Sequence, residues 1–213
     1  MIRALFEAMR QSRHVLGLNA RNLQFLRPLN LKQARLVADN KLLTKKTLKA
    51  AGIAVPKTYA IIGSAKQLRE FNSEELPKSF VLKPNRGLGG EGIILTYNKK
   101  GEGVWLDNEL KGISWDDIRS HVQDILDGRF PLANMPDIAF FEERLVRESM
   151  FKHLVYRGVP DIRVIVYNRV PIMAMMRFPT HESRGKANLH LGSIGVGVDI
   201  CRGVTTHTIC RDR

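Results

Sequence analysis

Three features are scarce in this sequence. The 213 residues include 2 cysteines, aromatic residues make up 7%, and no apolar run approaches the roughly 20 residues that a membrane-spanning helix needs. Residues 1–6 lack the long apolar core and the small-residue cleavage site of a signal peptide. These absences argue against an exported or membrane-spanning protein, and we expect the chain to be cytoplasmic, with no transmembrane segment.

The two cysteines, Cys201 and Cys210, flank a turn that we expect around Gly203. A disulfide across this turn is compatible with the pattern, but so few cysteines without an export signal favour a reduced pair. The sequence also contains no zinc-ligand spacing, no readable nucleophile–base arrangement, no internal repeat and no low-complexity tract.

Acidic residues are outnumbered by basic ones. The chain has 34 Lys and Arg against 21 Asp and Glu, a formal charge of +13, and residues 1–50 carry +9 of it. Such a basic segment can meet nucleic acid, an anionic membrane surface or an acidic substrate. Because the few aromatic residues do not alternate with the basic ones, we expect no nucleic-acid partner.

Hydrophobic periodicity and turn residues predict an α+β fold. We expect residues 1–30 to form helices that break near Gly17 and Pro28, followed by a helix that Asp39 or Asn40 caps. Further helices are expected at 65–71 and 115–126, and strands at 59–62, 80–82, 93–95, 104–106, 139–146, 159–167, 170–178 and 194–200.

The most informative stretch is the loop between the expected strands 80–82 and 93–95. Four glycines within it leave little side chain, so that backbone N–H groups can close on a bulky anion: Gly87, Gly89, Gly90 and Gly92. Lys83 leads into the loop and Arg86 stands in it, which fits a polyphosphate. The spacing matches neither a Walker loop nor a dinucleotide fingerprint, and the loop leads into a strand. A flap over ATP is therefore the favoured interpretation, and an ordinary glycine-rich hairpin is the alternative.

An ATP site also needs cations and a ribose-binding carboxylate. Lys41 and Lys83 are the candidate phosphate ligands, although Lys41 fits equally well as a solvated helix lysine. Glu142 and Glu143 are the candidates near the base, and Glu148 near the ribose. Acidic residues on a solvated strand face are the alternative for each of these three.

A third cluster begins at Asp161-Ile162-Arg163. On antiparallel neighbouring strands, Arg163 and Arg177 can point into one cleft, where their forked guanidinium groups match a phosphate or a carboxylate. A structural ion pair between Asp161 and Arg163 is the alternative. Downstream, Asn188 suits a phosphate oxygen or a metal-bound water, and His190 suits a substrate or phosphate contact or a structural role.

Taken together these residues resemble the ATP-grasp superfamily, and within it the alpha-L-glutamate ligase-like, RimK-related proteins that are also grouped as sugar-transfer-associated ATP-grasp proteins. The resemblance runs from about residue 16 to the C-terminus. It is carried by Asn40-Lys41, Gly52-Ile53-Ala54-Val55-Pro56, Lys83-Pro84 with the glycine loop, Glu142-Glu143, Asp161-Ile162-Arg163, Ala174-Met175-Met176-Arg177 and Lys186-Ala187-Asn188-Leu189-His190.

The resemblance implies two α+β lobes that sandwich ATP. It also implies an ATP-dependent carboxylate–amine ligase, which forms an amide through an acyl phosphate, with glutamate as one candidate substrate. Its partners would be ATP, Mg²⁺ and small-molecule or peptide carboxylates and amines. By the same resemblance the cofactor-binding residues would be Lys41, Lys83, Arg86, Gly87, Gly89, Gly90, Gly92, Glu142, Glu143, Glu148 and Asn188, and the catalytic residues Arg163, Arg177, Lys186 and His190.

The sequence departs from the family pattern in two places. Asn40 stands where the family usually has Asp, a minor change because Asn also caps helices. After Asn188 the chain offers only Asp199 and Asp212 as carboxylates, and neither lies in the family's Glu-x-Asn metal pattern, so no metal ligands are assigned. We therefore expect a basic helical segment at 1–38, a nucleotide-binding lobe at 39–138 and an incomplete second lobe at 139–213, truncated at the C-terminus. A nucleotide-binding remnant or regulatory protein without catalysis is the main alternative, and a basic RNA- or membrane-associated module is the other.

Overall fold

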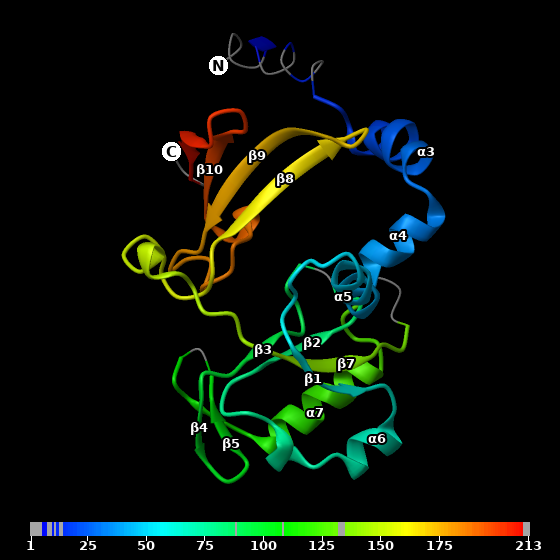
Figure 1. Ribbon diagram of the computed structural model, residues 1–213, viewed down its shortest axis with the longest axis vertical. Helices are drawn as coiled ribbons and strands as arrows, with labels where there is room; N and C mark the ends of the chain where they lie inside the picture. The colour runs from blue at the N-terminus through cyan, green and yellow to red at the C-terminus, as the bar shows by residue number, and fades with distance from the viewer. Residues whose placement is uncertain are drawn as a thin grey trace. The chain divides into compact units, whose positions relative to one another are not determined.

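The computed structural model describes residues 6, 7, 10, 12, 15–87, 89–107, 109–131 and 135–210. The chain divides into two units, Met1–Thr47 and Leu48–Arg213. The second unit contains two four-stranded sheets and one three-stranded sheet, and the three-stranded sheet is inserted in the chain between β3 and β7 of the first sheet (Figure 1).

The first unit is helical in its described part. Residues 18–29 form one continuous helical run, made of α2 (Leu18–Ala20), η1 (Arg21–Leu26) and α3 (Arg27–Leu29). Gly17 precedes this run, as expected, but Pro28 does not break it. The wider π-helical turn before Pro28, in which the N–H of Arg27 donates to the carbonyl of Asn22, accommodates a residue that has no N–H to donate.

Two further helices follow, α4 (Lys32–Asp39) and α5 (Lys41–Ala50). The predicted cap at Asn40 is confirmed, because its side-chain oxygen accepts the N–H of Leu43 at 2.8 Å. Gly52 adopts a positive φ of 75° just beyond α5, the conformation in which a glycine commonly ends a helix.

The first sheet is antiparallel, with the strand order β1-β7-β2-β3. Its strands are β1 (Thr58–Ile62), β2 (Val81–Pro84), β3 (Ile94–Leu95) and β7 (Ala139–Glu142), and its helices are α6 (Ala65–Glu70) and α7 (Trp115–Leu126). The strand expected over 139–146 ends at Glu142. Because β7 pairs with both β1 and β2, this sheet draws on residues from both sides of the division expected at 138/139.

Alternation along these strands separates a core face from a second face. Leu82 lies opposite Phe141, and Ile62 opposite Ala139, on the face that packs against α6 and α7. Val81 lies opposite Glu142, and Leu95 opposite Val81, on the other face. The core between the sheet and these helices includes Ile62, Phe80, Leu82 and Phe141 from the sheet side and Leu68, Ile118, Val122 and Ile125 from the helices.

The second sheet has the order β4-β5-β6 and caps one end of this core. Its strands are β4 (Asn98–Gly101), β5 (Val104–Leu106) and β6 (Gly112–Ser114). Trp105 from β5 is fully buried and packs edge-on against Phe80, with 5.6 Å between ring centroids. A short 3₁₀ helix, η2 (Ser73–Glu75), precedes β2.

The third sheet has the order β11-β10-β9-β8. Its strands are β8 (Asp161–Tyr167), β9 (Val170–Phe178), β10 (Ile194–Asp199) and β11 (Val204–Ile209), and the 3₁₀ helices η3 (Ser149–Phe151) and η4 (Leu189–Leu191) lie in its connections. The predicted two-residue turn is confirmed, with positive φ angles at Asn168 and Arg169. The strand β11 was not predicted.

Both cysteines are free and exposed. Asp199 lies opposite Val204 and Gly195 opposite Ile209, so Cys201 falls in the turn and Cys210 beyond the far end of β11. The two are therefore not cross-strand neighbours, and a disulfide across the turn does not fit this register. Among the helices of the described residues, none has the length and apolar character that a membrane span requires.

The start of α7 generates the first testable prediction. Ser114 and Asp117 form a capping box, in which each side chain binds the backbone N–H of the other residue. We expect Ser114→Ala to lower the free energy of unfolding by about 1 kcal/mol. The measurement is urea denaturation at neutral pH, followed by tryptophan fluorescence.

The same variant has an expected pH dependence. Hydrogen bonds from the hydroxyl and the N–H of Ser114 lower the pKa of Asp117. A lowered pKa in the folded state adds stability above the unfolded-state pKa, and this contribution is lost as the pH falls through the folded-state value. The difference between wild type and Ser114→Ala should therefore narrow in acid, and a constant difference would contradict this account.

Candidate functional site

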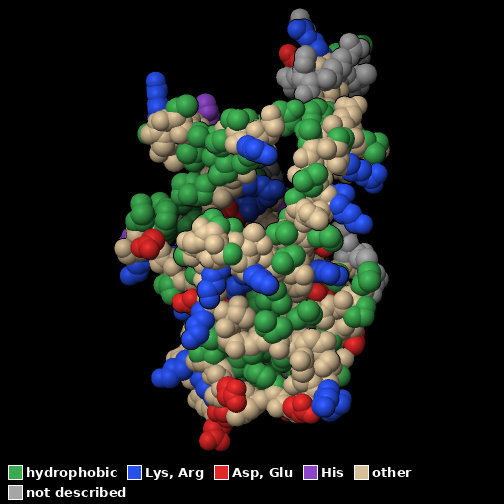
Figure 2. Space-filling model, turned by 45° about the vertical axis from the view of Figure 1, so that its right-hand side comes forward, with side chains coloured by type: hydrophobic (Ala, Val, Ile, Leu, Met, Phe, Trp, Pro, Cys, Tyr) green, Lys and Arg blue, Asp and Glu red, His purple; other side chains and the backbone are tan. Residues whose placement is uncertain are grey.

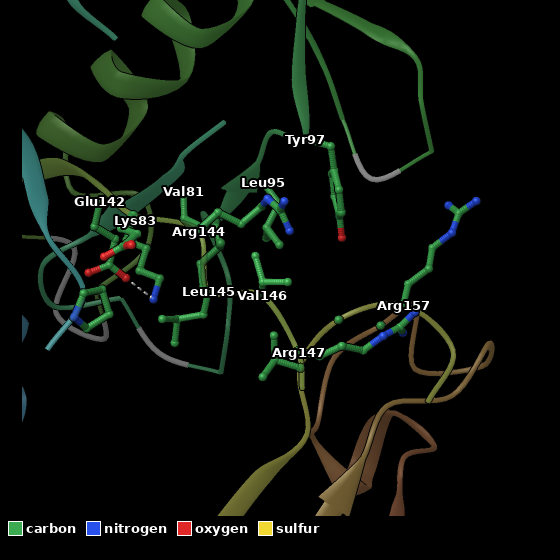
Figure 3. Close-up of a pocket in the computed structure, with 16 residues that line it drawn as sticks. Val81, Lys83, Leu95, Tyr97, Glu142, Arg144, Leu145, Val146, Arg147 and Arg157 are labelled. Carbon is green, nitrogen blue, oxygen red and sulfur yellow. Dashed lines mark ion pairs between the residues drawn. The ribbon is translucent and has the colours of Figure 1, made fainter. Parts of the chain in front are cut away.

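A pocket of about 460 Å³ lies on the face of the first sheet that does not form the core (Figure 3). Its floor comes from β2, β3 and the segment that follows β7, and its far wall from residues 157–159 and Gly185. The lining residues are Pro56, Val81, Lys83, Ile93, Leu95, Tyr97, Glu142, Glu143, Arg144, Leu145, Val146, Arg147, Arg157, Gly158, Val159 and Gly185. Apolar walls with a few charged groups are the usual make-up of a small-molecule site.

The floor contains an ion pair between Lys83 and Glu142. The ammonium nitrogen Nζ lies 2.6 Å from Oε1 of the carboxylate, and the Glu142 side chain is only 5% exposed. The two residues are diagonal neighbours on one face, because Lys83 pairs with Phe140 and Glu142 with Val81. The predicted residues Lys83 and Glu142 thus lie together, and the dashed line in Figure 3 marks their ion pair.

Glu143 fastens the segment that follows β7. Its Oε2 accepts the N–H of Lys57 at 3.0 Å, and its own N–H donates to the carbonyl of Lys57 at 2.8 Å. Beyond it, within the described part of the chain, no hydrogen bond engages the backbone groups of Leu145 or Val146. The pocket wall therefore presents backbone donors and acceptors at a fixed place.

Arg144 and Tyr97 form a second feature of the wall that the sequence did not reveal. The guanidinium carbon Cζ of Arg144 lies 4.6 Å from the centroid of the Tyr97 ring, a cation–π contact. Nε of Arg144 is buried without a hydrogen-bond partner. Arg144 directly follows the Glu142-Glu143 pair, which was the available signal, whereas no pattern in the sequence singled out Tyr97.

The base of the glycine loop is held by packing against the chain before β7. The N–H of Asn85 donates to the carbonyl of Ile138, and the N–H of Arg86 to Oδ2 of Asp137. A Cβ on Gly87 would lie 2.3 Å from Cγ of Pro84, and a Cβ on Gly92 would lie 2.7 Å from Cγ of Phe130. These two glycines are therefore required by the fold itself.

The tip of the loop is different. Gly89 and Gly90 have positive φ angles of 62° and 79°, and no atom lies within 4 Å of a Cβ built on Gly89. The Arg86 side chain is exposed beside them. Nζ of Lys186 lies 3.4 Å from the carbonyl oxygen of Gly90, which brings one predicted catalytic residue to the loop.

On the third sheet, Arg177 is engaged by Asp161. Nε donates to Oδ1 at 2.7 Å and a second nitrogen donates to Oδ2, so the guanidinium grips the carboxylate with two bonds. These hydrogen bonds raise the pKa of Arg177 above its ordinary value. Asp161 thus pairs with Arg177, and not with Arg163 as in the alternative considered from the sequence.

Arg163 lies on the same face of the sheet as Arg177. Asp161 is opposite Arg177 in the register, and Arg163 is two residues further along β8, so the three side chains share one face. Arg163 is exposed. The expected common orientation of the two arginines is therefore present in the strand register.

The remaining predicted residues are more scattered. Asn188 stands at the start of η4 without a side-chain cap hydrogen bond, and His190 is exposed within η4. Glu148 is exposed at the start of η3. Lys41 belongs to the first unit, Met1–Thr47, and opens α5 there.

Of the residues predicted for the site, three line the pocket: Lys83, Glu142 and Glu143. The residues predicted from the loop and the third sheet lie outside its lining: Arg86, Gly87, Gly89, Gly90, Gly92, Glu148, Arg163, Arg177, Lys186, Asn188 and His190. Lys83, Glu142 and Glu143 therefore lie together in one pocket, and Lys186 lies within hydrogen-bond distance of the glycine loop.

A magnesium site held by protein carboxylates does not fit this donor set. Among the residues that the structure describes, no group of three or more His, Cys, Asp or Glu could hold a metal ion. Asp199, the one described carboxylate after Asn188, accepts the N–H groups of Cys201 and Arg202 through Oδ1 and so stabilises the turn after β10. Asp212 lies outside the described residues.

The two classes of loop glycine generate a prediction. We expect Gly92→Ala to destabilise the fold by about 1–3 kcal/mol more than Gly89→Ala, because its new methyl group overlaps the Phe130 ring. Gly89→Ala should lower the free energy of unfolding by about 1–2 kcal/mol, because alanine is strained in the left-handed conformation while its methyl group meets no other atom. Urea denaturation of both variants measures the difference, and equal losses would contradict the assignment of Gly92 to packing.

Comparison with known proteins supplies the family. The model of the sugar-transfer associated ATP-grasp family matches residues 20–212. No match was found among the curated proteins or among the solved structures. The match spans the helical run, the glycine loop, the pocket and the third sheet. The chain therefore belongs to the sugar-transfer associated ATP-grasp family.

Proposed function

We propose that this chain is an ATP-dependent carboxylate–amine ligase that binds the adenosine end of ATP in the pocket on the first sheet. The observation that carries the proposal is the pocket itself: apolar walls meet a segment with unengaged backbone groups beside the paired Lys83 and Glu142. ATP-dependent activity of the ligase type is what membership of the ATP-grasp family suggests.

The residues present fit a nucleotide. A purine needs two apolar faces and an edge with one donor and one acceptor. Val81, Leu95 and Leu145 supply apolar surface, and the backbone at Leu145 and Val146 supplies the edge. Glu143 holds that edge in place through Lys57. Glu148, at the start of η3, is our candidate for the ribose hydroxyls.

Phosphates would lie toward the glycine loop. Lys83 already forms an ion pair with Glu142, and the Glu142 carboxylate repels a phosphate. The Lys83 ammonium group therefore attracts a phosphate only where the phosphate oxygen lies nearer to Nζ than to that carboxylate. Two unit charges 4 Å apart interact by about 1 kcal/mol in water and by about 4 kcal/mol in a partly screened site. We therefore assign much of the phosphate binding to the backbone of Gly89 and Gly90 and to Arg86 and Lys186. The assignment of Lys41 to a phosphate rests on the sequence alone.

The reaction proceeds in two transfers. The substrate carboxylate attacks the γ-phosphorus, and the bond from phosphorus to the bridging oxygen of ADP breaks. The amine nitrogen then attacks the acyl carbon, phosphate leaves, and the amine proton goes to phosphate. Arg163 would offset the charge of the substrate carboxylate. Arg177 would offset the same charge if its ion pair with Asp161 opened. Lys186, Asn188 and His190 would contact the transferred phosphoryl group. Mg²⁺ would arrive bound to the phosphates of ATP, and no step is assigned to a protein-held metal.

Two observations favour a second function, nucleotide binding without catalysis. Two guanidinium nitrogens of Arg177 donate hydrogen bonds to Asp161. The described residues also hold no metal-binding carboxylate cluster. A regulatory nucleotide-binding protein would need the pocket but not these groups. Glutamate as a substrate of the ligase rests on the resemblance of the sequence alone.

Variants at the ion pair test nucleotide binding. Lys83→Met alone removes the ammonium group from the buried Glu142 carboxylate, which should cost about 1–3 kcal/mol of stability. Lys83→Met with Glu142→Gln removes both charges and should recover much of that loss. Both variants should bind Mg-ATP about tenfold to a hundredfold more weakly, the worth of one charge-assisted hydrogen bond.

Titration calorimetry gives the affinity and urea denaturation gives the stability of the same samples. The double variant separates the two effects, because we expect it to fold although it lacks the ammonium group. If the folded double variant binds Mg-ATP as tightly as the wild type does, Lys83 is not a phosphate ligand.

A turnover assay tests ligation. We expect ADP release to require both a carboxylate and an amine, with L-glutamate tried in each role. Arg163→Gln should lower kcat/KM for the carboxylate about tenfold to a hundredfold while ATP affinity is unchanged. Arg169→Gln, in the turn of the same hairpin, is the matched control. ADP release that ignores every acceptor, with Arg163→Gln equal to its control, would favour the non-catalytic function.

A further inference from the structure

The helical first unit carries exposed leucines that the proposed reaction does not use. Within residues 18–29, Leu23, Leu26 and Leu29 are 58%, 37% and 56% exposed. Leu18 and Leu31, at the two ends of this run, are more than two-thirds exposed. No residue of the helices α2 to α5 is buried. An exposed apolar surface of this kind marks an interaction site.

Leucines and basic residues share the exposed surface of the run. Leu23, Leu26 and Leu29 are exposed, and so are Arg21 and Arg27. Because the π-helical part turns through fewer degrees per residue than an α-helix, the two kinds of side chain lie next to each other, and the long arginine stems can extend their charge beyond the neighbouring leucines. In Figure 2 basic and hydrophobic side chains are both visible on this segment. We call residues 18–31 the amphipathic run.

The charge of this unit has one sign. Residues 15–47 contain seven Lys or Arg and one acidic residue, Asp39, a net charge of +6. The same residues contain one aromatic side chain, Phe25. Nucleic acid would gain little stacking from such a surface and would leave the leucines in water. An anionic bilayer surface meets both needs, because it offers negative headgroups and an acyl boundary for the leucines.

We propose that the amphipathic run binds the surface of a membrane that contains anionic lipid, with its leucines at the acyl boundary and its basic residues among the headgroups. This interaction lies beyond the ligase reaction and does not depend on it. It would hold the ATP-binding unit next to substrates at a membrane surface.

The test is sedimentation of the full chain with vesicles. We expect binding to vesicles of phosphatidylcholine mixed with phosphatidylglycerol, and little binding to phosphatidylcholine alone. Each basic residue near such a surface changes the binding constant about fivefold, so Arg21→Gln with Arg27→Gln should weaken binding about 25-fold. High salt should weaken it in the same direction.

A second variant separates apolar insertion from charge. Leu23→Gln, Leu26→Gln and Leu29→Gln together keep the charge and the helix propensity, and should weaken binding about tenfold or more. Leu110→Gln with Leu154→Gln, two leucines each 64% exposed in the second unit, is the matched control and should bind as wild type does. Circular dichroism and urea denaturation show that each variant is folded.

Several outcomes would overturn the proposal. They are the absence of vesicle binding in the folded wild type, equal binding to neutral and anionic vesicles, and leucine variants that bind as tightly as the control. Salt-sensitive binding to RNA that the leucine variants retain, without vesicle binding, would assign the basic residues to nucleic acid instead.

Discussion

The ion pair between Lys83 and Glu142 joins two neighbouring strands on the face of the first sheet that turns away from the core. A carboxylate as buried as that of Glu142 needs a partner, and the diagonal position on β2 supplies a lysine at 2.6 Å. The residues between them in the alternation, Leu82 and Phe141, point the other way into the core. The strand register between β2 and β7 therefore decides which side chains pack in the core and which face the pocket.

The glycine loop depends on the same strands, since it connects β2 to β3. Its glycines do two kinds of work. Gly87 and Gly92 let the loop base pack against Pro84 and Phe130, whereas Gly89 and Gly90 supply a backbone conformation at a tip with open space around it. A rigid base with a side-chain-poor tip suits a flap that closes on an anion, and Lys186, from the segment between β9 and η4, lies beside this tip.

Charge is distributed differently in the two units. In the second unit two cations lie in close ion pairs: Lys83 with Glu142 in the pocket, and Arg177 with Asp161 on the third sheet. Residues 15–47 hold seven Lys or Arg against one acidic residue, and they include exposed leucines. Ion pairs of fixed geometry can orient a small ligand, while an excess of basic residues next to apolar surface suits a large and anionic surface.

Much of the local structure could be predicted from the sequence because its causes are local. The cap at Asn40, the capping box at Ser114 and Asp117, the turn at Asn168-Arg169 and the strand–loop–strand around the glycines all follow from a few neighbouring residues. The helix break predicted at Pro28 was wrong, because a π-helical turn before it accommodates a residue without an N–H. The strand β11 was not predicted, because the short polar segment 204–209 has little hydrophobic alternation.

By itself the sequence determined the α+β class, the glycine loop and the residue types that suit ATP, because propensity, capping and spacing act over short distances. Only the tertiary structure decided which charges meet. It paired Lys83 with Glu142 and Arg177 with Asp161, placed Tyr97 against Arg144, and left Arg163 outside the pocket. These contacts depend on strand register and on packing between segments far apart in the chain, which no local pattern encodes.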